Sequence, residues 1–110
     1  MYEMSEEIVI FFPGQGSQKP GMMKQLRASN VGREYMARAN KVLNYDLDHQ
    51  IDNWTDDEFA ETLHAQPAIF VCSIIAFESI DKSFLNKYKK IFAGLSLGEY
   101  TCMVASGKLS

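Results

Sequence analysis

The sequence of 110 residues has little of what marks several protein classes. Its 11 lysines and arginines are outnumbered by 14 aspartates and glutamates, so it lacks the basic surplus that neutralises a nucleic-acid backbone, and no nucleic-acid partner is expected. Its longest uncharged apolar stretch, residues 65–77, is shorter than the roughly 18 to 20 residues that span a bilayer. The first seven residues are acidic, unlike a secretory signal. We expect at most one domain, soluble and cytoplasmic, with no membrane partner.

Cysteine and histidine are also scarce. Cys72 and Cys102 lie in apolar stretches, without a CxxC pair or a histidine at metal-ligand spacing, which favours buried, reduced thiols over a disulfide. The acidic segment 46–63 lacks the DxDxDG spacing of a calcium loop, so it is interpreted as a solvated face on short, loosely packed helices. No metal site and no cofactor is predicted.

The order of apolar segments predicts an α/β fold with a parallel sheet. The runs at residues 7–12 and 91–95 are rich in β-branched and aromatic side chains, and the first is typical of a central strand that is covered on both faces. Helices are predicted at residues 22–26, 32–43, 67–84, with Pro67 in the first turn, and 97–106. Ligands gather at the carboxyl ends of strands in such sheets.

A GxSxG pattern, Gly94-Leu-Ser-Leu-Gly98, lies between the second predicted strand and the last predicted helix. In that setting the pattern is typical of a nucleophile elbow, whose glycines avoid collisions between a Cβ and the neighbouring strand or helix. Ser96 is the predicted nucleophile. The backbone N–H of Leu97, at the start of the helix, is predicted to stabilise an oxyanion during acyl transfer.

A second glycine-rich turn follows the first predicted strand. Residues 13–21 contain three of the seven glycines and two of the three prolines, so the backbone turns sharply there and comes close to another group. If the two strands are adjacent, this turn converges on Ser96, and Gln15 supplies a second backbone oxyanion donor, with Gly14 and Gly16 beside it at the substrate. The turn lacks the Lys-Ser/Thr pair of a P-loop and the third glycine of a GxGxxG loop.

Three motifs together resemble one family. Phe12-Pro-Gly-Gln-Gly-Ser-Gln18, Gln66-Pro-Ala68 and Gly94-Leu-Ser-Leu-Gly-Glu-Tyr100 resemble, in this order, the amino-terminal part of the malonyl-CoA:acyl carrier protein transacylases, acyltransferases of fatty acid and polyketide synthesis. The resemblance implies the amino-terminal portion of an α/β-hydrolase-like core, with residues 1–110 as an incomplete large subdomain. It further implies malonyl transfer from coenzyme A to the acyl carrier protein through a Ser96 ester, with Gln66 lining the site.

The resemblance also implies parts that these residues do not contain. Members of the family carry, after this region, an arginine for the malonyl carboxylate, a ferredoxin-like subdomain and a histidine base, and neither His49 nor His64 matches that base. Leu95 stands where many members carry histidine. The chain alone is therefore expected to be inactive and to expose apolar surface, which the missing part, as a separate chain, would cover.

Two alternatives remain. In the first, the chain is a non-catalytic fragment, or a subunit that completes an acyltransferase with a second chain. In the second, it is a small GxSxG serine hydrolase. A hydrolase needs an acid and a histidine after its serine, and only Glu99 follows Ser96.

Overall fold

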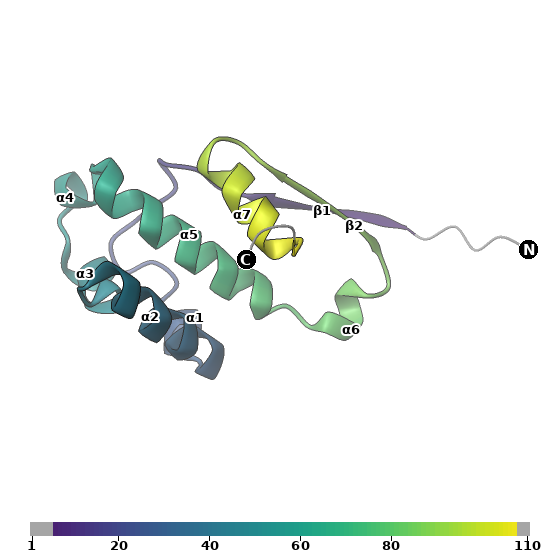
Figure 1. Cartoon of the computed structure of the whole chain (residues 1–110), viewed down its shortest axis with the longest axis horizontal. Helices are drawn as coiled ribbons and strands as arrows, with labels where there is room; N and C mark the ends of the chain where they lie inside the picture. Colours follow the sequence, from purple (N-terminus) through teal and green to yellow (C-terminus); the bar gives the residue numbers. More distant parts are fainter. Residues whose placement is uncertain (1–5, 108–110) are drawn as a thin grey trace, which may run out of the picture.

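The computed structural model describes residues 6–107 and is organised around one long central helix, α5 (Figure 1). On one side of it lie four shorter helices, which together with α5 form the helical layer. On the other side lie two strands and the last helix, the sheet layer. The elements are β1 (Glu7–Phe12), α1 (Lys24–Ala28), α2 (Asn30–Leu43), α3 (Leu47–Asn53), α4 (Asp56–Ala60), α5 (Thr62–Glu78), α6 (Lys82–Leu85), β2 (Lys89–Gly94) and α7 (Leu97–Ala105). The α/β fold predicted from the sequence is confirmed.

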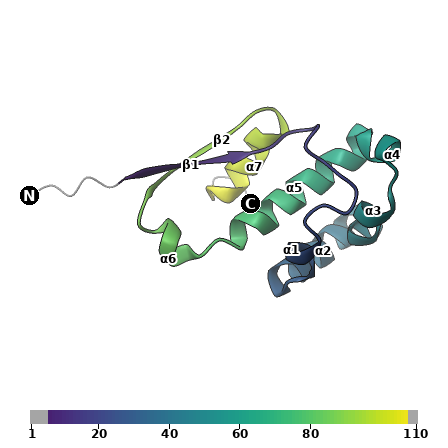
Figure 2. The ribbon, with the colours of Figure 1, turned by 180° about the vertical axis from the view of Figure 1, so that it is seen from behind.

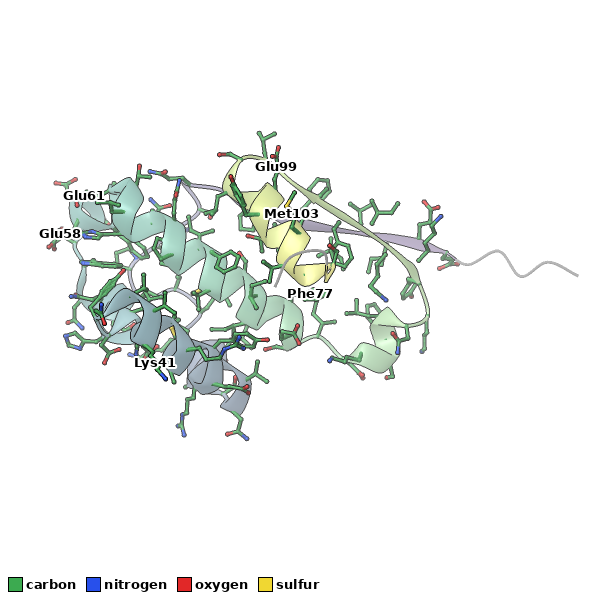
Figure 3. All side chains as sticks on the ribbon, viewed as in Figure 1. Lys41, Glu58, Glu61, Phe77, Glu99 and Met103 are labelled. Atoms are coloured by element: carbon green, nitrogen blue, oxygen red, sulfur yellow. The ribbon has the colours of Figure 1, made fainter. Side chains whose placement is uncertain are left out.

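The two strands form a parallel pair, so their carboxyl ends meet at one edge. Phe12, the last residue of β1, is paired with Gly94, the last residue of β2. Helix α7 packs against both strands. At the end of α5, the ring of Phe77 makes edge contacts with the rings of Phe12 and Phe92, with centroids 5.9 and 5.6 Å apart (Figure 3). These aromatic contacts join the two layers.

The opposite face of the sheet is open. Val9, Phe11 and Ile91 point to this side and are 48, 76 and 39% exposed. The view from behind shows no helix of the described residues crossing the two strands there (Figure 2). The prediction that β1 is covered on both faces is therefore wrong for residues 6–107, whereas the predicted exposure of apolar surface is confirmed. Because parallel sheets in other proteins almost always have both faces covered, the open face of this sheet is unusual.

The acidic segment supplies much of the core of the helical layer. Leu47 and Ile51 are fully buried, and Trp54 and Phe59 nearly so, against Met36 of α2 and the apolar face of α5. The prediction of loose surface packing is wrong, because α3 and α4 are amphipathic and the acidic side chains lie mainly on their outer faces. The side chains of Asp46 and Thr55 also cap these helices, each accepting a backbone N–H bond.

One buried charge ties α1 to α3. Arg27 is 3% exposed and donates hydrogen bonds to the carboxylates of Asp48 and Asp52, at 2.6 and 2.5 Å, and to the Met22 carbonyl oxygen. The hydrogen bond from Arg27 lowers the pKa of Asp52 below its ordinary value. The acidic segment therefore does more than form the solvated face that the sequence predicts, because Asp48 and Asp52 pair with the buried Arg27.

Helix α5 begins and ends earlier than predicted. It starts at Thr62, so Pro67 lies inside the helix and the prediction that it occupies the first turn is wrong. Proline removes only the hydrogen bond to the Leu63 carbonyl group, and Leu63 is 84% exposed, so water can replace that bond. The helix stops at Glu78, and Asp81 caps the separate helix α6.

Other boundaries also differ from the prediction, and α2 begins two residues earlier, at Asn30. Strand β2 begins at Lys89, two residues before the predicted apolar run, because its pairing with β1 continues through both lysines. Helix α1 begins at Lys24, since Met23 adopts a left-handed backbone conformation, with φ of 55°, directly before it.

Candidate active site

The turn from β2 into α7 holds Ser96 in an unusual backbone conformation. Its φ of 55° and ψ of −113° lie outside the regions that non-glycine residues favour, at a cost on the order of 1–3 kcal/mol. The side chain is exposed. Such strain persists only where the surrounding structure holds the residue in place.

Two glycines allow this turn to pack tightly. A Cβ at Gly94 would collide with the backbone of Gly98, and a Cβ at Gly98 would collide with the carbonyl oxygen of Phe12. The first contact closes the turn on itself, and the second seats the start of α7 against β1. Both glycines of the GxSxG pattern are therefore required by backbone contacts, as predicted from the sequence.

The start of α7 offers one backbone donor beside Ser96. The N–H groups of Gly98 and Glu99 donate to the carbonyl groups of Leu95 and Ser96, both at 3.0 Å. Within residues 6–107, no hydrogen bond uses the N–H of Leu97. The amino terminus of a helix carries a partial positive charge, so this N–H can donate to an anionic oxygen that forms next to Ser96.

The glycine-rich turn at residues 13–21 contacts the turn that carries Ser96. A Cβ at Gly14 would lie 3.2 Å from the Leu95 carbonyl oxygen, so the two turns are in contact and their predicted convergence is confirmed. The N–H of Gly16 donates to the Gln18 side chain at 2.8 Å. In the described part of the chain, the N–H of Gln15 makes no hydrogen bond. Within that part of the chain, the N–H groups of both predicted oxyanion donors, Gln15 and Leu97, therefore make no hydrogen bond.

The Gln15 side chain links this turn to the helical layer. Its Nε2 donates to the Ala60 carbonyl oxygen at 3.2 Å and to Thr62 Oγ1 at 3.1 Å. Thr62 in turn lines a shallow cleft of about 300 Å³ that also contains the predicted site residue Gln66 and the predicted donor residue Leu97. The structure therefore brings Gln66 and Leu97 together. Thr62 is the residue here that sequence reasoning missed, because no local pattern signals a contact across 47 residues.

Neither histidine is engaged with this turn. His49 is exposed, and its backbone carbonyl oxygen accepts a hydrogen bond of 2.7 Å from the side-chain amide of Asn53. The ring of His64 stacks on Trp54, with centroids 4.3 Å apart, and its Nδ1 lies 2.7 Å from the Glu58 carbonyl oxygen. Both histidines make their contacts within the helical layer.

Neither cysteine thiol has a lowered pKa. Burial raises the pKa of Cys72 to about 12, so its thiol stays protonated near neutral pH. Cys102 is half-buried, which corrects the prediction that it is buried, and burial raises its pKa as well. Residues 6–107 contain no group of three or more His, Cys, Asp or Glu that could hold a metal ion.

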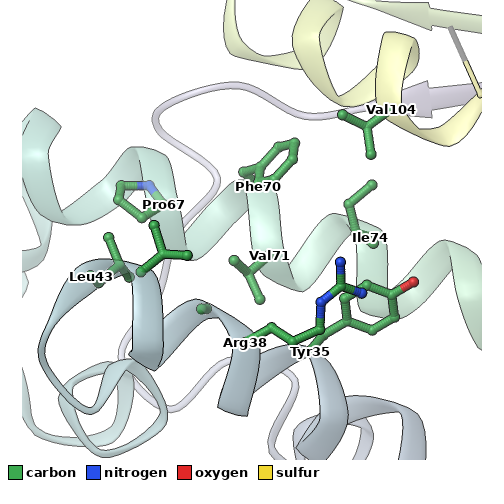
Figure 4. A pocket seen from close by; sticks show the side chains of 10 residues that line it. Tyr35, Arg38, Leu43, Pro67, Phe70, Val71, Ile74 and Val104 are labelled. Atoms are coloured by element: carbon green, nitrogen blue, oxygen red, sulfur yellow. The ribbon is translucent and has the colours of Figure 1, made fainter. Parts of the chain in front are cut away.

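A second hollow lies beside the cleft. An apolar groove of about 440 Å³ runs between α2, α5 and α7 (Figure 4). Pro67 and Phe70 line both the groove and the cleft, and the guanidinium group of Arg38 lies 5.2 Å from the centre of the Tyr35 ring at the groove. None of the helices in the described ranges is long and apolar enough to cross a membrane.

Comparison with known families finds a match over nearly the whole sequence. Residues 9–110 match the acyl transferase domain. The chain is 37% identical over 103 residues to the human mitochondrial malonyl-CoA-acyl carrier protein transacylase, covering 92% of this chain and 26% of the human protein. It is 36% identical over 105 residues to the malonyl CoA-acyl carrier protein transacylase of Bacillus subtilis, covering 94% of this chain and 32% of the relative.

Solved structures show the same relation. The malonyl CoA-acyl carrier protein transacylase of Coxiella burnetii superimposes with a TM-score of 0.81 at 31% identity, over 97% of this chain and 34% of that chain. The Helicobacter pylori enzyme of the same name gives a TM-score of 0.80 at 31% identity, over 94% and 34%. The chain thus spans about a third of the length of these relatives.

Proposed function

The chain belongs to the acyl transferase domain family, and on this premise we propose that it carries the acyl-accepting part of a malonyl-CoA:acyl carrier protein transacylase. The observation that supports this most strongly is the strained Ser96 at the strand-to-helix turn, with the Leu97 N–H beside it. We interpret this turn as a nucleophile elbow. The N–H of Gln15, on the adjoining turn, is the second proposed oxyanion donor.

The proposed reaction has two half-reactions. The Oγ of Ser96 attacks the thioester carbonyl carbon of malonyl-CoA, its proton passes to a base, and the carbonyl oxygen becomes an oxyanion that accepts hydrogen bonds from Gln15 and Leu97. The C–S bond then breaks, and coenzyme A leaves as a thiol after taking up that proton. In the second half-reaction, the phosphopantetheine thiol of acyl carrier protein attacks the Ser96 ester and restores the serine hydroxyl group.

The base for this reaction is proposed to come from polypeptide outside these 110 residues. The contacts of His49 and His64 lie in the helical layer, and a serine hydroxyl group without a base is a weak nucleophile. The open face of the sheet, with Val9, Phe11 and Ile91, supports an association with such a polypeptide, continuous with this chain or separate.

Gly14, Gly16 and Gln66 are proposed to lie along the bound acyl thioester, because the first two flank Gln15 and the third shares a cleft with Leu97. Malonyl-CoA enters as a substrate, and no cofactor or metal is proposed. The relatives' printed names support malonyl-CoA and acyl carrier protein as partners. A cytoplasmic location is proposed because both thiols are free.

Intact-mass analysis after incubation with malonyl-CoA tests this function. We expect one malonyl adduct that hydroxylamine removes, as it removes an ester, and that Ser96→Ala abolishes. Ser106→Ala, at the end of α7, is the matched control and should keep the adduct. Because the base is expected from elsewhere, the purified chain should react several orders of magnitude more slowly than a sample that includes the completing polypeptide.

Two results would contradict the proposal. An adduct that persists in Ser96→Ala would place the acyl group on another residue. Failure of the wild-type chain to form an adduct, both alone and with the completing polypeptide, would show that Ser96 does not accept malonyl groups.

A further inference from the structure

We propose that Thr62 is a positioning residue for the oxyanion donor on Gln15, an inference that rests on the proposed function. Thr62 is the first residue of α5, and its Oγ1 accepts a hydrogen bond of 3.1 Å from Gln15 Nε2. The Thr62 hydroxyl group thereby fixes the side chain of the residue whose backbone N–H is the proposed donor. The proposed role of Thr62 is exerted through Gln15 rather than on the reacting atoms.

The turn has few other anchors. Within residues 13–20, the hydrogen bonds of Gly16 and Ser17 go to Gln18 and Gly14, which belong to the same turn. Among the described residues, this segment is hydrogen-bonded to a helix or strand only through Gln15 Nε2, which bonds to α4 and α5. The next connection comes at Gly21, whose N–H donates to the Ile51 carbonyl oxygen at 2.8 Å.

The two acceptors of Gln15 differ in what a substitution can remove. The Ala60 acceptor is a backbone carbonyl group, which persists in any variant, whereas the Thr62 acceptor is a side chain. An oxyanion donor is effective only when it is held in place before charge develops. Losing the hydroxyl group should therefore leave Gln15 attached at one point, with greater freedom in its backbone.

The chemistry of this link suggests a pair of variants. Thr62→Val keeps the shape of the side chain and removes the acceptor, whereas Thr62→Ser keeps the acceptor and removes a methyl group. Thr62 is exposed, so neither change alters the core. Ser83→Ala, which removes a hydroxyl hydrogen bond from α6 to its N-cap residue Asp81, is a control for a similar loss at a distance from the turn.

Two measurements on the full chain test the inference. The first is the ¹⁵N order parameter of the Gln15 backbone N–H, expected to be about 0.85 in the wild type and below about 0.6 in Thr62→Val. The second is the Ser96 acylation rate with malonyl-CoA in the sample that includes the completing polypeptide, expected to fall about threefold to tenfold at saturation, as for one lost hydrogen bond, without a change in the half-saturating concentration. Thr62→Ser should restore both values, and Ser83→Ala should change neither.

Several outcomes would overturn the inference. An unchanged order parameter in Thr62→Val would show that the hydroxyl group does not hold the turn. A lower order parameter with an unchanged acylation rate would show that the link has no positioning role. If the wild-type chain forms no adduct, either alone or with the completing polypeptide, the proposed function fails, and the order parameter alone then decides whether Thr62 holds the Gln15 backbone.

Discussion

The helical layer and the sheet layer differ in how completely they bury their apolar side chains. In the helical layer, Leu47, Ile51 and Phe59 are at most 1% exposed. In the sheet layer, Phe11 is 76% exposed and Met103 on α7 is 48% exposed. The strained Ser96 and its neighbouring N–H groups lie in the second, less covered layer. The difference indicates that the helical layer has a closed core of its own, although Val42 and Leu63 are exposed on its surface, and that the proposed chemistry lies in the more open layer.

The largest expected effect comes from the centre of the helical layer. Ile51→Ala should lower the free energy of unfolding by about 3 kcal/mol, because a fully buried aliphatic side chain leaves a cavity when it is truncated. Trp54 is the one tryptophan of the sequence and lies in this core, so its fluorescence during urea unfolding reports on the helical layer.

Val42→Ala is the matched control for that change. Val42 lies on α2 of the same layer but is 81% exposed, so its truncation should change the free energy of unfolding by less than about 0.5 kcal/mol. Equal effects of the two substitutions would mean that the helical layer has no tightly packed core, and the contrast between the layers would fail.

A smaller effect is expected where the sheet layer is held together. Gly98→Ala should destabilise this layer by about 2 kcal/mol, because the new methyl group meets the Phe12 carbonyl oxygen and overpacks a backbone contact. The loss should appear in the amide exchange of β1 and β2, and Glu99→Ala, at the next and exposed position, should lack it. An equal drop in the Trp54 transition would contradict separate behaviour of the two layers.

The smallest effect on stability is expected on the open face of the sheet. Phe11→Ser should change the free energy of unfolding by less than about 0.5 kcal/mol, since the side chain is largely in solvent already. It should, however, reduce concentration-dependent association, measured by sedimentation velocity. Leu63→Ser, at a position of similar exposure on α5, is the comparison. If both substitutions reduce association equally, the open face is not the adhesive surface.

Local patterns in the sequence predict most of the candidate site. The alternation of strand, glycine-rich turn and helix places Ser96 and Gln15 at the same sheet edge, and the two glycines of GxSxG match the backbone contacts of Gly94 and Gly98. These features depend on steric rules that act over a few residues.

What the sequence does not predict depends on contacts between distant segments. The acidic segment becomes core because Ile51 and Phe59 meet α2 and α5, and its charges conceal that pattern. The pairing of Arg27 with Asp52 and the link from Gln15 to Thr62 each join residues more than twenty positions apart. The bounds of α5 depend on packing as well, since the surrounding helices outweigh the cost of Pro67 inside it.

The contrast between the two layers is tested most directly by amide hydrogen exchange resolved by residue on the full chain. The amides of α5 that face the core around Cys72 and Ile75 should exchange at least about tenfold more slowly than those between β1 and β2, because buried apolar contacts raise the free energy of local opening. Equal protection of the strands and of α5 would contradict the view that Ser96 lies in an open layer supported by a closed one.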